Sequence, residues 1–200
     1  IKKSLITKVV KLLYKISLHC SSFTFFQNFD DQQFFIDSNL VALKKSALLP
    51  GSGVDTKKFY PQPRKNRSTF RFLMVARLIR DKGIHEYIEA AKLLREDGIE
   101  FWILGEIGAS NKTALTKEEI NKYTKQKVVN FFDRTDDVKS FLDRVDCVVL
   151  PSYREGSPRC IMEASSVELP VIVSDVPGCR QVVDNNVTGL YCKVRDSEDL

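Results

Sequence analysis

Residues 147–163 read CVVLPSYREGSPRCIME. The apolar run at 147–150 is typical of a buried strand, and Pro151 ends it. A loop follows, in which Ser157 is predicted to be the N-cap of the next helix and Pro158 its first residue. A strand, a loop and a helix in this order present unpaired backbone N–H groups and the positive end of a helix dipole, which suit an anion.

A carboxylate lies on each side of this junction. Glu155 is in the loop, and Glu163 is five residues past Pro158, which places it roughly 7–8 Å along the helix axis at ~1.5 Å per residue. An extended ligand with phosphates in its middle and hydroxyl-rich groups at both ends matches that layout, as a nucleoside diphosphate sugar does. The alternative is a surface pair of Arg159 and Glu163 at i,i+4 spacing, with Glu155 a solvated loop acid.

From residue 70 onward, short apolar runs alternate with helical patterns. The runs are continuous, as in the strands of a parallel sheet that is buried on both faces. This alternation predicts an α/β fold with a doubly wound, parallel, Rossmann-like sheet, in which ligands bind beyond the carboxyl ends of the strands. The predicted strands are 72–76, 101–104, 128–132, 147–150 and 171–173.

The earlier part of the chain predicts a separate domain. Short strands are expected at 23–26 and 47–50 with a short helix at 30–36, and the proline-containing, basic segment 56–69 resembles an interdomain linker. We therefore expect residues 1–62 to be the end of an N-terminal domain with its linker, and residues 63–200 to be a second domain that stops before its C-terminus.

The net charge of +5 comes from one segment of the chain. Lys2, Lys3, Lys8, Lys11 and Lys15 lie in a stretch without acids, and the other 26 basic residues equal the 26 acidic ones. Such a distribution does not predict a nucleic-acid-binding surface. Five cysteines without CxxC spacing, and no apolar run near the ~18 residues of a membrane span, favour a reduced, cytoplasmic chain.

Residues 3–18 show the pattern of a basic amphipathic helix. Two interpretations remain open. Residues 2–18 could make a peripheral contact with the anionic inner face of the cell membrane. Alternatively, the helix packs on its domain and keeps its lysines in water.

Two glutamates separated by seven residues, after a strand and entering a helix, resemble the donor-site motif of glycosyltransferase family four. The flanking sequence also resembles this family, with LPSYREG at 150–156 and PVIVSDVPG at 170–178. The resemblance implies one lobe of the two-lobed GT-B architecture and a retaining, metal-independent transfer of a hexose or N-acetylhexosamine from a UDP-sugar. The acceptor, a surface polysaccharide or lipid-linked glycan, would be held by the N-terminal domain, of which only the end is expected here.

The resemblance also assigns roles to individual residues. Glu155 would be catalytic, contacting the donor sugar near the reacting carbon, and Glu163 would hold the ribose hydroxyls. The donor-binding set would further comprise Arg77 and Lys82 on the diphosphate, the backbone of Gly156, Ser157, Pro158 and Arg159 on sugar and phosphate, the loops at Gly105 and Arg134 around the base, and the turn at Gly53 lining the cleft.

The chain offers cations rather than a metal site for the leaving phosphate. It has no Asp-x-Asp motif and two histidines, so no metal and no cofactor are expected, and it has neither a Walker P-loop nor a Gly-x-Gly-x-x-Gly motif. Fixed cations can stabilise the negative charge that builds on the departing diphosphate.

The sequence departs from the family pattern at Asp133, where glycine is frequent, at Glu168, where a helix-ending glycine is usual, and at Gln181, where glutamate is common. None of these positions is a motif glutamate. We therefore expect the chain to bind its donor but to be inactive alone. The alternative is a non-catalytic nucleotide-sugar sensor or scaffold with a degenerate site.

Overall fold

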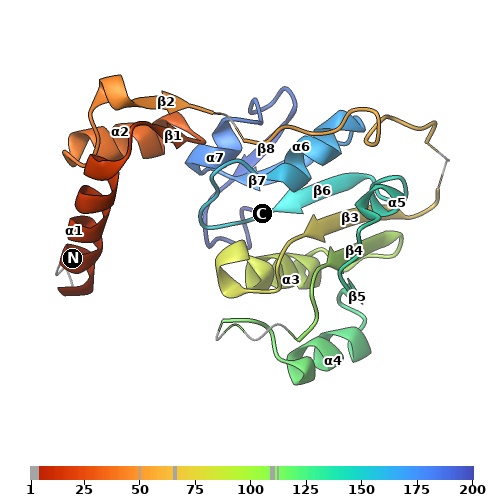
Figure 1. Cartoon of the computed structure of the whole chain (residues 1–200). Helices are drawn as coiled ribbons and strands as arrows, with labels where there is room; N and C mark the ends of the chain where they lie inside the picture. The colour runs from red at the N-terminus through yellow and green to blue at the C-terminus, as the bar shows by residue number, and fades with distance from the viewer. Residues whose placement is uncertain (1–4, 50, 65–66, 109–110, 112) are drawn as a thin grey trace. The chain divides into compact units, whose positions relative to one another are not determined.

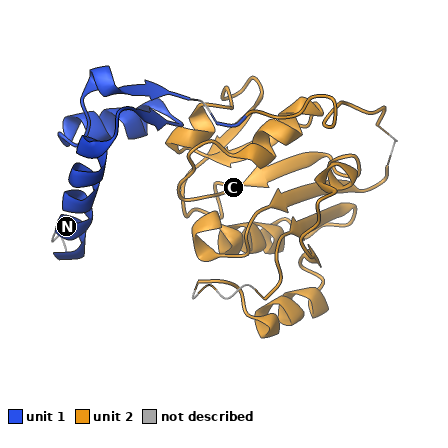
Figure 2. Cartoon of the chain, in the orientation of Figure 1, with its two compact units in different colours: residues 1–52 blue, residues 53–200 orange. Residues whose placement is uncertain are grey.

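The computed structural model describes residues 5–49, 51–64, 67–108, 111 and 113–200. The chain forms two compact units, Ile1–Ser52 and Gly53–Leu200 (Figure 2). The division lies before the linker rather than at the expected 62/63. The reason is that Phe59 is 5% exposed in the core of the second unit and its carbonyl accepts a 2.5 Å hydrogen bond from Ser166.

Unit 1 contains a long exposed helix and a short parallel strand pair. Helix α1 (Leu5–Cys20) precedes β1 (Thr24–Phe26), α2 (Phe29–Asp37), the 3₁₀ turn η1 (Leu43–Lys45) and β2 (Ser46–Leu48), with β1 and β2 parallel. Asn28 caps α2 by accepting the N–H of Asp31 at 2.8 Å. The expected elements are confirmed, while residues 3–4 of the predicted helix and residue 50 of the predicted strand lie outside the described residues.

Unit 2 is built on a six-stranded parallel sheet with the order β5-β4-β3-β6-β7-β8 (Figure 1). The predicted doubly wound fold is confirmed. The chain runs outward from β3 to β5 and then returns to place β6 beside β3, which makes the β3–β6 junction a topological switch point. The strands are β3 (Phe70–Val75), β4 (Ile99–Leu104), β5 (Asn130–Phe132), β6 (Cys147–Leu150), β7 (Val171–Ser174) and β8 (Gly189–Cys192).

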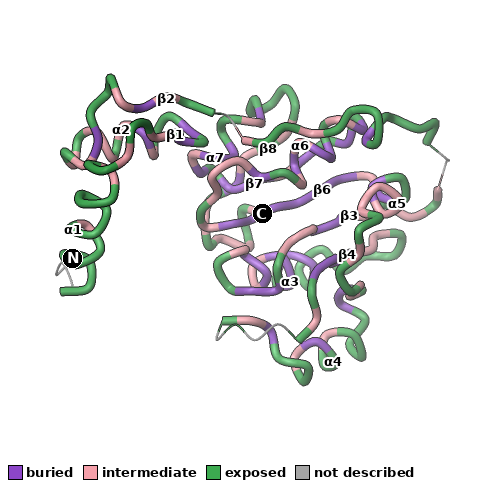
Figure 3. The backbone as a smooth tube through the Cα atoms, in the orientation of Figure 1, coloured by how far each residue is buried: buried purple, intermediate pink, exposed green. Residues whose placement is uncertain are grey.

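Helices cover both faces of this sheet because successive strand residues point to opposite sides. Leu73 and Val148 join one buried cluster, while their neighbours Met74 and Val149 join the other. Strand β6 between these clusters is buried along its length (Figure 3). The connecting elements are η2 (Arg80–Lys82), α3 (Ile84–Leu93), α4 (Lys117–Lys125), α5 (Val138–Leu142), α6 (Arg159–Ser166) and α7 (Pro177–Arg180).

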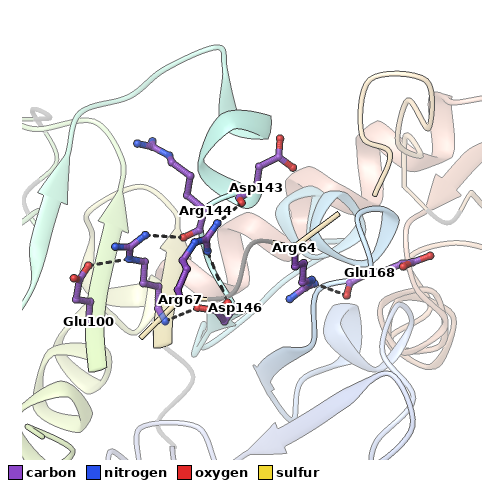
Figure 4. A network of polar contacts seen from close by, with 8 residues as sticks. Arg64, Arg67, Glu100, Asp143, Arg144, Asp146 and Glu168 are labelled. Atoms are coloured by element: carbon purple, nitrogen blue, oxygen red, sulfur yellow. Dashed lines mark hydrogen bonds and ion pairs between the residues drawn. The ribbon is translucent and has the colours of Figure 1, made fainter. Parts of the chain in front are cut away.

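A polar network holds the linker at the edge of the sheet where the strands begin (Figure 4). Arg67 donates to the carbonyl of Asp143 at 2.7 Å and lies 3.8 Å from the carboxylate of Asp146, which accepts the backbone N–H of Arg71 at 2.8 Å. Arg71 also donates to Glu100 at 3.1 Å. These contacts therefore lie at the opposite edge of the sheet from the carboxyl ends of the strands, where ligands bind in such folds.

Candidate functional site

The junction between β6 and α6 differs in detail from the prediction. Helix α6 begins at Arg159, and Pro158 is its N-cap, with a ψ of 108° that is extended rather than helical. The prediction of Ser157 as the N-cap and Pro158 as the first helical residue was therefore wrong. The Ser157 hydroxyl is buried and has no hydrogen-bond partner among the described residues, so it is a polar group at this turn that a ligand could satisfy.

Glu155, in the loop after β6, meets Lys82 from the end of η2. The ammonium nitrogen lies 2.5 Å from Oε1 of the carboxylate, and the two side chains are 20% and 11% exposed. A cation at the start of α3 is unfavourable by itself, because it faces the positive end of the helix dipole. The paired carboxylate of Glu155 offsets that cost. The ion pair thus places a positive and a negative group together near the ends of β3 and β6.

Glu163 lies one turn into α6 and is 8% exposed. Its carboxylate accepts a 3.3 Å hydrogen bond from Arg159, whose side chain is 68% exposed. Burial raises the pKa of Glu163, and the charges of Arg159 and Lys58 partly offset that rise. The i,i+4 pair therefore exists, but the acid is largely sheltered from water rather than solvated as a surface pair would be.

A pocket of about 260 Å³ opens beyond the ends of β3 and β4. Its lining includes Arg77, Gly105 and Arg134, three residues to which the family resemblance gives a role in donor binding. A Cβ on Gly105 would lie 2.0 Å from the carbonyl oxygen of Ala76, so glycine is required for the close approach of this loop to β3.

Asp133 ties together the two loops beside this pocket. Its Oδ1 accepts the backbone N–H groups of Ile107 at 3.1 Å and Arg134 at 2.8 Å. These two donors lower the pKa of Asp133. The aspartate that replaces a frequent glycine thus joins the loop after β4 to the loop after β5.

The predicted site residues form three groups at one edge of the sheet: Lys82 with Glu155, the junction 156–159 with Glu163, and the residues around the pocket. Gly53, the first residue of unit 2, is exposed with a φ of 72° and belongs to none of them. Its role in the cleft stays a prediction. Among the described residues, no cluster of histidine, cysteine, aspartate or glutamate could hold a metal ion.

Gly178 and Lys58 were not among the predicted site residues. A Cβ on Gly178 would lie 2.4 Å from the carbonyl oxygen of Glu155, so this glycine supports the loop. Lys58 donates to the carbonyl of Asp136 at 3.3 Å and lies close enough to Glu163 to influence its pKa. The sequence around Gly178 was part of the family pattern, whereas no motif or spacing in the sequence singled out Lys58.

A family model described as "Glycosyl transferases group 1" matches residues 55–200. The chain belongs to this family. It is 28% identical over its whole length to N,N'-diacetylbacillosaminyl-diphospho-undecaprenol alpha-1,3-N-acetylgalactosaminyltransferase of Campylobacter jejuni, covering 54% of that protein. It is 30% identical to UDP-Gal:alpha-D-GlcNAc-diphosphoundecaprenol alpha-1,3-galactosyltransferase of Escherichia coli, where the match covers 96% of this chain and 54% of the relative.

Several solved structures share the fold. Sucrose-phosphate synthase from Thermosynechococcus elongatus superposes with a TM-score of 0.83 at 19% identity, over 100% of this chain and 52% of that one. Anabaena HepE in complex with UDP gives 0.81 at 18% identity, over 94% and 56%. Unit 2 is thus one lobe of a GT-B glycosyltransferase fold, and the chain spans about half the length of the curated relatives it matches.

Proposed function

We propose that unit 2 binds the donor of a retaining, metal-independent glycosyltransferase of family four. The complete enzyme would transfer a hexose or N-acetylhexosamine from a UDP-sugar to a surface polysaccharide or a lipid-linked glycan. The observation that supports this most directly is the arrangement at the end of β6: two sheltered carboxylates, each paired with a cation, flank the start of α6.

The donor would lie across this edge of the sheet. The base occupies the pocket beside Gly105 and Arg134, and Glu163 accepts hydrogen bonds from the ribose hydroxyls. Arg77, Lys82 and the backbone from Gly156 to Arg159, including Ser157 and Pro158, hold the diphosphate, while Glu155 contacts the sugar. Binding a diphosphate at the start of α6 agrees with the anion preference of helix N-termini.

The chemistry follows from the charge that develops during transfer. As the bond between the sugar and the diphosphate breaks, negative charge builds on the leaving oxygen. Arg77 and Lys82 would place positive charge beside that oxygen, and a fixed cation stabilises the transition state more than the ground state. We assign no step to a metal ion or a cofactor, since the cationic side chains supply the required charge.

The relatives' names support the substrate classes. One is an N-acetylgalactosaminyltransferase and another takes galactose from UDP-Gal, and both names include diphospho-undecaprenol acceptors. Unit 1 would be the end of the N-terminal domain that holds such an acceptor. The chain by itself would bind the donor without transferring its sugar.

Helix α1 suggests where the enzyme works. None of its described residues is buried, and Leu5 and Leu13 are 77% and 60% exposed while Lys8, Lys11 and Lys15 are also accessible. We infer a peripheral contact between this helix and an anionic membrane at its cytoplasmic face. The described residues include no helix that is long and apolar enough to cross a membrane. Sedimentation with vesicles that contain acidic lipid, but not with neutral vesicles, is the expected result; equal sedimentation with both would contradict it.

Calorimetric titration of this chain with UDP, GDP and ADP tests the donor assignment. We expect binding of UDP in preference to the two purine nucleotides, and no binding of any of them would contradict the proposal. A transfer assay with the complete protein and a panel of UDP- and GDP-sugars separates an enzyme from a non-catalytic nucleotide-sugar sensor, because only the enzyme releases the nucleotide.

A further inference from the structure

Lys82 and Glu155 lie on two loops that are fastened to each other through their backbones. The segment 81–83 precedes α3, and the segment 151–155 follows β6. A Cβ on Gly83 would lie 2.0 Å from the carbonyl oxygen of Pro151, so the backbones of the two segments are in contact. The position of one loop therefore depends directly on the position of the other.

Ser152 bridges these loops with its side chain. The residue is 0% exposed, and its single O–H proton is shared between the carbonyl oxygens of Asp81 and Arg154, each 3.2 Å from the hydroxyl oxygen. The same Asp81 carbonyl accepts the backbone N–H of Tyr153 at 2.9 Å. These carbonyls belong to the residues immediately before Lys82 and Glu155.

We propose that Ser152 is a positioning residue for donor binding, because its buried hydroxyl joins the residue before Lys82 to the residue before Glu155 and so fixes the distance between the two functional groups. This inference rests on the proposed function, since it assumes that Lys82 holds the diphosphate. Ser152 itself does not touch the donor. It acts through the placement of the ammonium group that does.

The hydrogen bonds make this role specific rather than a general effect of packing. Removing the hydroxyl takes the shared donor away from both carbonyls, while the Asp81 carbonyl still accepts the N–H of Tyr153. The Asp81 carbonyl then keeps one of its two hydrogen bonds to the loop after β6. A displacement of the order of 1 Å at a positioned charge is enough to weaken its interaction with a ligand.

The test is a double-substitution cycle read by UDP affinity. Ser152→Ala should lower the affinity about fivefold, as expected for the loss of one neutral hydrogen bond. In a Lys82→Met background the same substitution should have no further effect, because Ser152 acts through Lys82. Ser152→Cys keeps nearly the same volume with a weak donor and should show the same loss, which keeps the test available if the alanine variant fails to fold.

Ser174→Ala is the matched control. Ser174 is also 0% exposed and lies at the end of the neighbouring strand β7, but its hydroxyl lies beside the Cys192 sulfur at 4.0 Å and not between loops. This variant should bind UDP like the wild-type chain. If Ser174→Ala weakened UDP binding as much as Ser152→Ala, the loss would reflect packing alone and the inference would be overturned.

The remaining outcomes separate the inference from the proposed function. Wild-type affinity in both Ser152 variants, with weakened binding in Lys82→Met, would overturn the inference and leave the donor site intact. Equal losses from Ser152→Ala in the wild-type and Lys82→Met backgrounds would also overturn it. A wild-type chain that does not bind UDP would remove the proposed function and this inference together.

Discussion

The ammonium group of Lys82 and the carboxylate of Glu155 meet at 2.5 Å although 73 positions separate them in the sequence. Their side chains are 20% and 11% exposed. The pair of Lys92 and Glu89 on α3 is instead local, at i,i+3 spacing, and 37% and 51% exposed. The Lys82–Glu155 pair is therefore sheltered from water, whereas the Lys92–Glu89 pair is solvated, and the two can be compared within one fold.

Removal of Lys82 is expected to destabilise the fold as well as the site. Lys82→Met leaves the sheltered carboxylate of Glu155 without its cation and should lower the free energy of unfolding by about 1–3 kcal/mol. Lys92→Met should change it by less than about 0.5 kcal/mol, because the surface pair is screened by water. Urea unfolding of the two variants measures the difference, and equal effects would show that the Glu155 pair is no better protected than the one on α3.

The two motif glutamates should separate nucleotide binding from transfer. Glu163→Ala is expected to weaken UDP binding about tenfold or more, as for loss of hydrogen bonds to a charged acceptor. Glu155→Ala should leave UDP affinity nearly unchanged, because the Lys82 ammonium loses its carboxylate partner and stays free to bind the diphosphate, and it should abolish sugar transfer in the complete enzyme. Calorimetry and a transfer assay measure these outcomes, and undiminished UDP affinity in Glu163→Ala would refute the ribose assignment.

Glu163 should also make stability depend on pH. Burial raises its folded-state pKa above the ordinary value of 4.5, so just above that value the folded chain holds a proton that the unfolded chain has lost. The contribution of this carboxyl to stability therefore falls as pH rises through the interval from 4.5 to the raised pKa. Glu163→Gln removes the effect, so the variant should gain stability relative to the wild type as pH increases across that interval.

Urea unfolding at a series of pH values from about 4 to about 7 checks this sign. Glu118→Gln provides a control, since Glu118 is an exposed acid on α4. A difference between Glu163→Gln and the wild type that stays constant with pH would mean that this carboxyl has the same pKa in both states.

The strands and the site loops could be predicted because their signals are local. Each continuous apolar run became a parallel strand, and Pro151 marks the point where β6 ends. Strand β8 was not predicted because GLYC is short and only partly buried, and α4 was not predicted because Ile120 is its one buried residue. Their placement comes from tertiary packing rather than from periodicity.

The contacts within the site could not be read from the sequence. The motif spacing put Glu155 and Glu163 at one edge of the sheet, but the partner of Glu155 comes from a segment beside another strand. The cap of α6 was misassigned because the backbone of Pro158 is extended, which a proline permits as readily as a helical conformation. Residue type and spacing thus located the site, while long-range packing set its geometry.

Gly178 should be essential to the shape of the Glu155 loop. A Cβ there would lie 2.4 Å from the carbonyl oxygen of Glu155 and 2.6 Å from that of Gly156, so Gly178→Ala must push the loop away from α7. We expect a loss of about 1–3 kcal/mol in the free energy of unfolding, together with weaker UDP binding.

Gly189→Ala is the control for that substitution. Its Cβ would lie 2.5 Å from the carbonyl oxygen of Val171, in the sheet between β7 and β8 and not in the Glu155 loop. This variant should lose comparable stability and keep its UDP affinity at temperatures where it is folded. Thermal unfolding and calorimetry measure both quantities, and a similar loss of affinity in the two variants would mean that Gly178 acts only through global stability.

The end of α6 holds a strained residue that the sequence pattern anticipated. Glu168, at the position where the family usually has glycine, adopts a left-handed φ of 59°. The N–H groups of Glu168 and Leu169 donate to the carbonyls of Ser165 and Ala164, both at 3.0 Å, which is the hydrogen-bond pattern of a Schellman motif. Because the backbone is already in the conformation that glycine prefers, Glu168→Gly should raise the free energy of unfolding by about 0.5–1 kcal/mol.

Part of the relief of strain in that variant is offset by the greater freedom of glycine in the unfolded chain, which is why the expected gain is modest. Glu168→Ala separates the backbone effect from the loss of the carboxylate, since alanine keeps the Cβ and should bring no gain. The carbonyl of residue 168 still accepts the 2.7 Å hydrogen bond from Arg64 in both variants, so the linker contact is unchanged. If urea unfolding showed the glycine variant to be no more stable than the alanine variant, the left-handed conformation would not be a source of strain at this helix end.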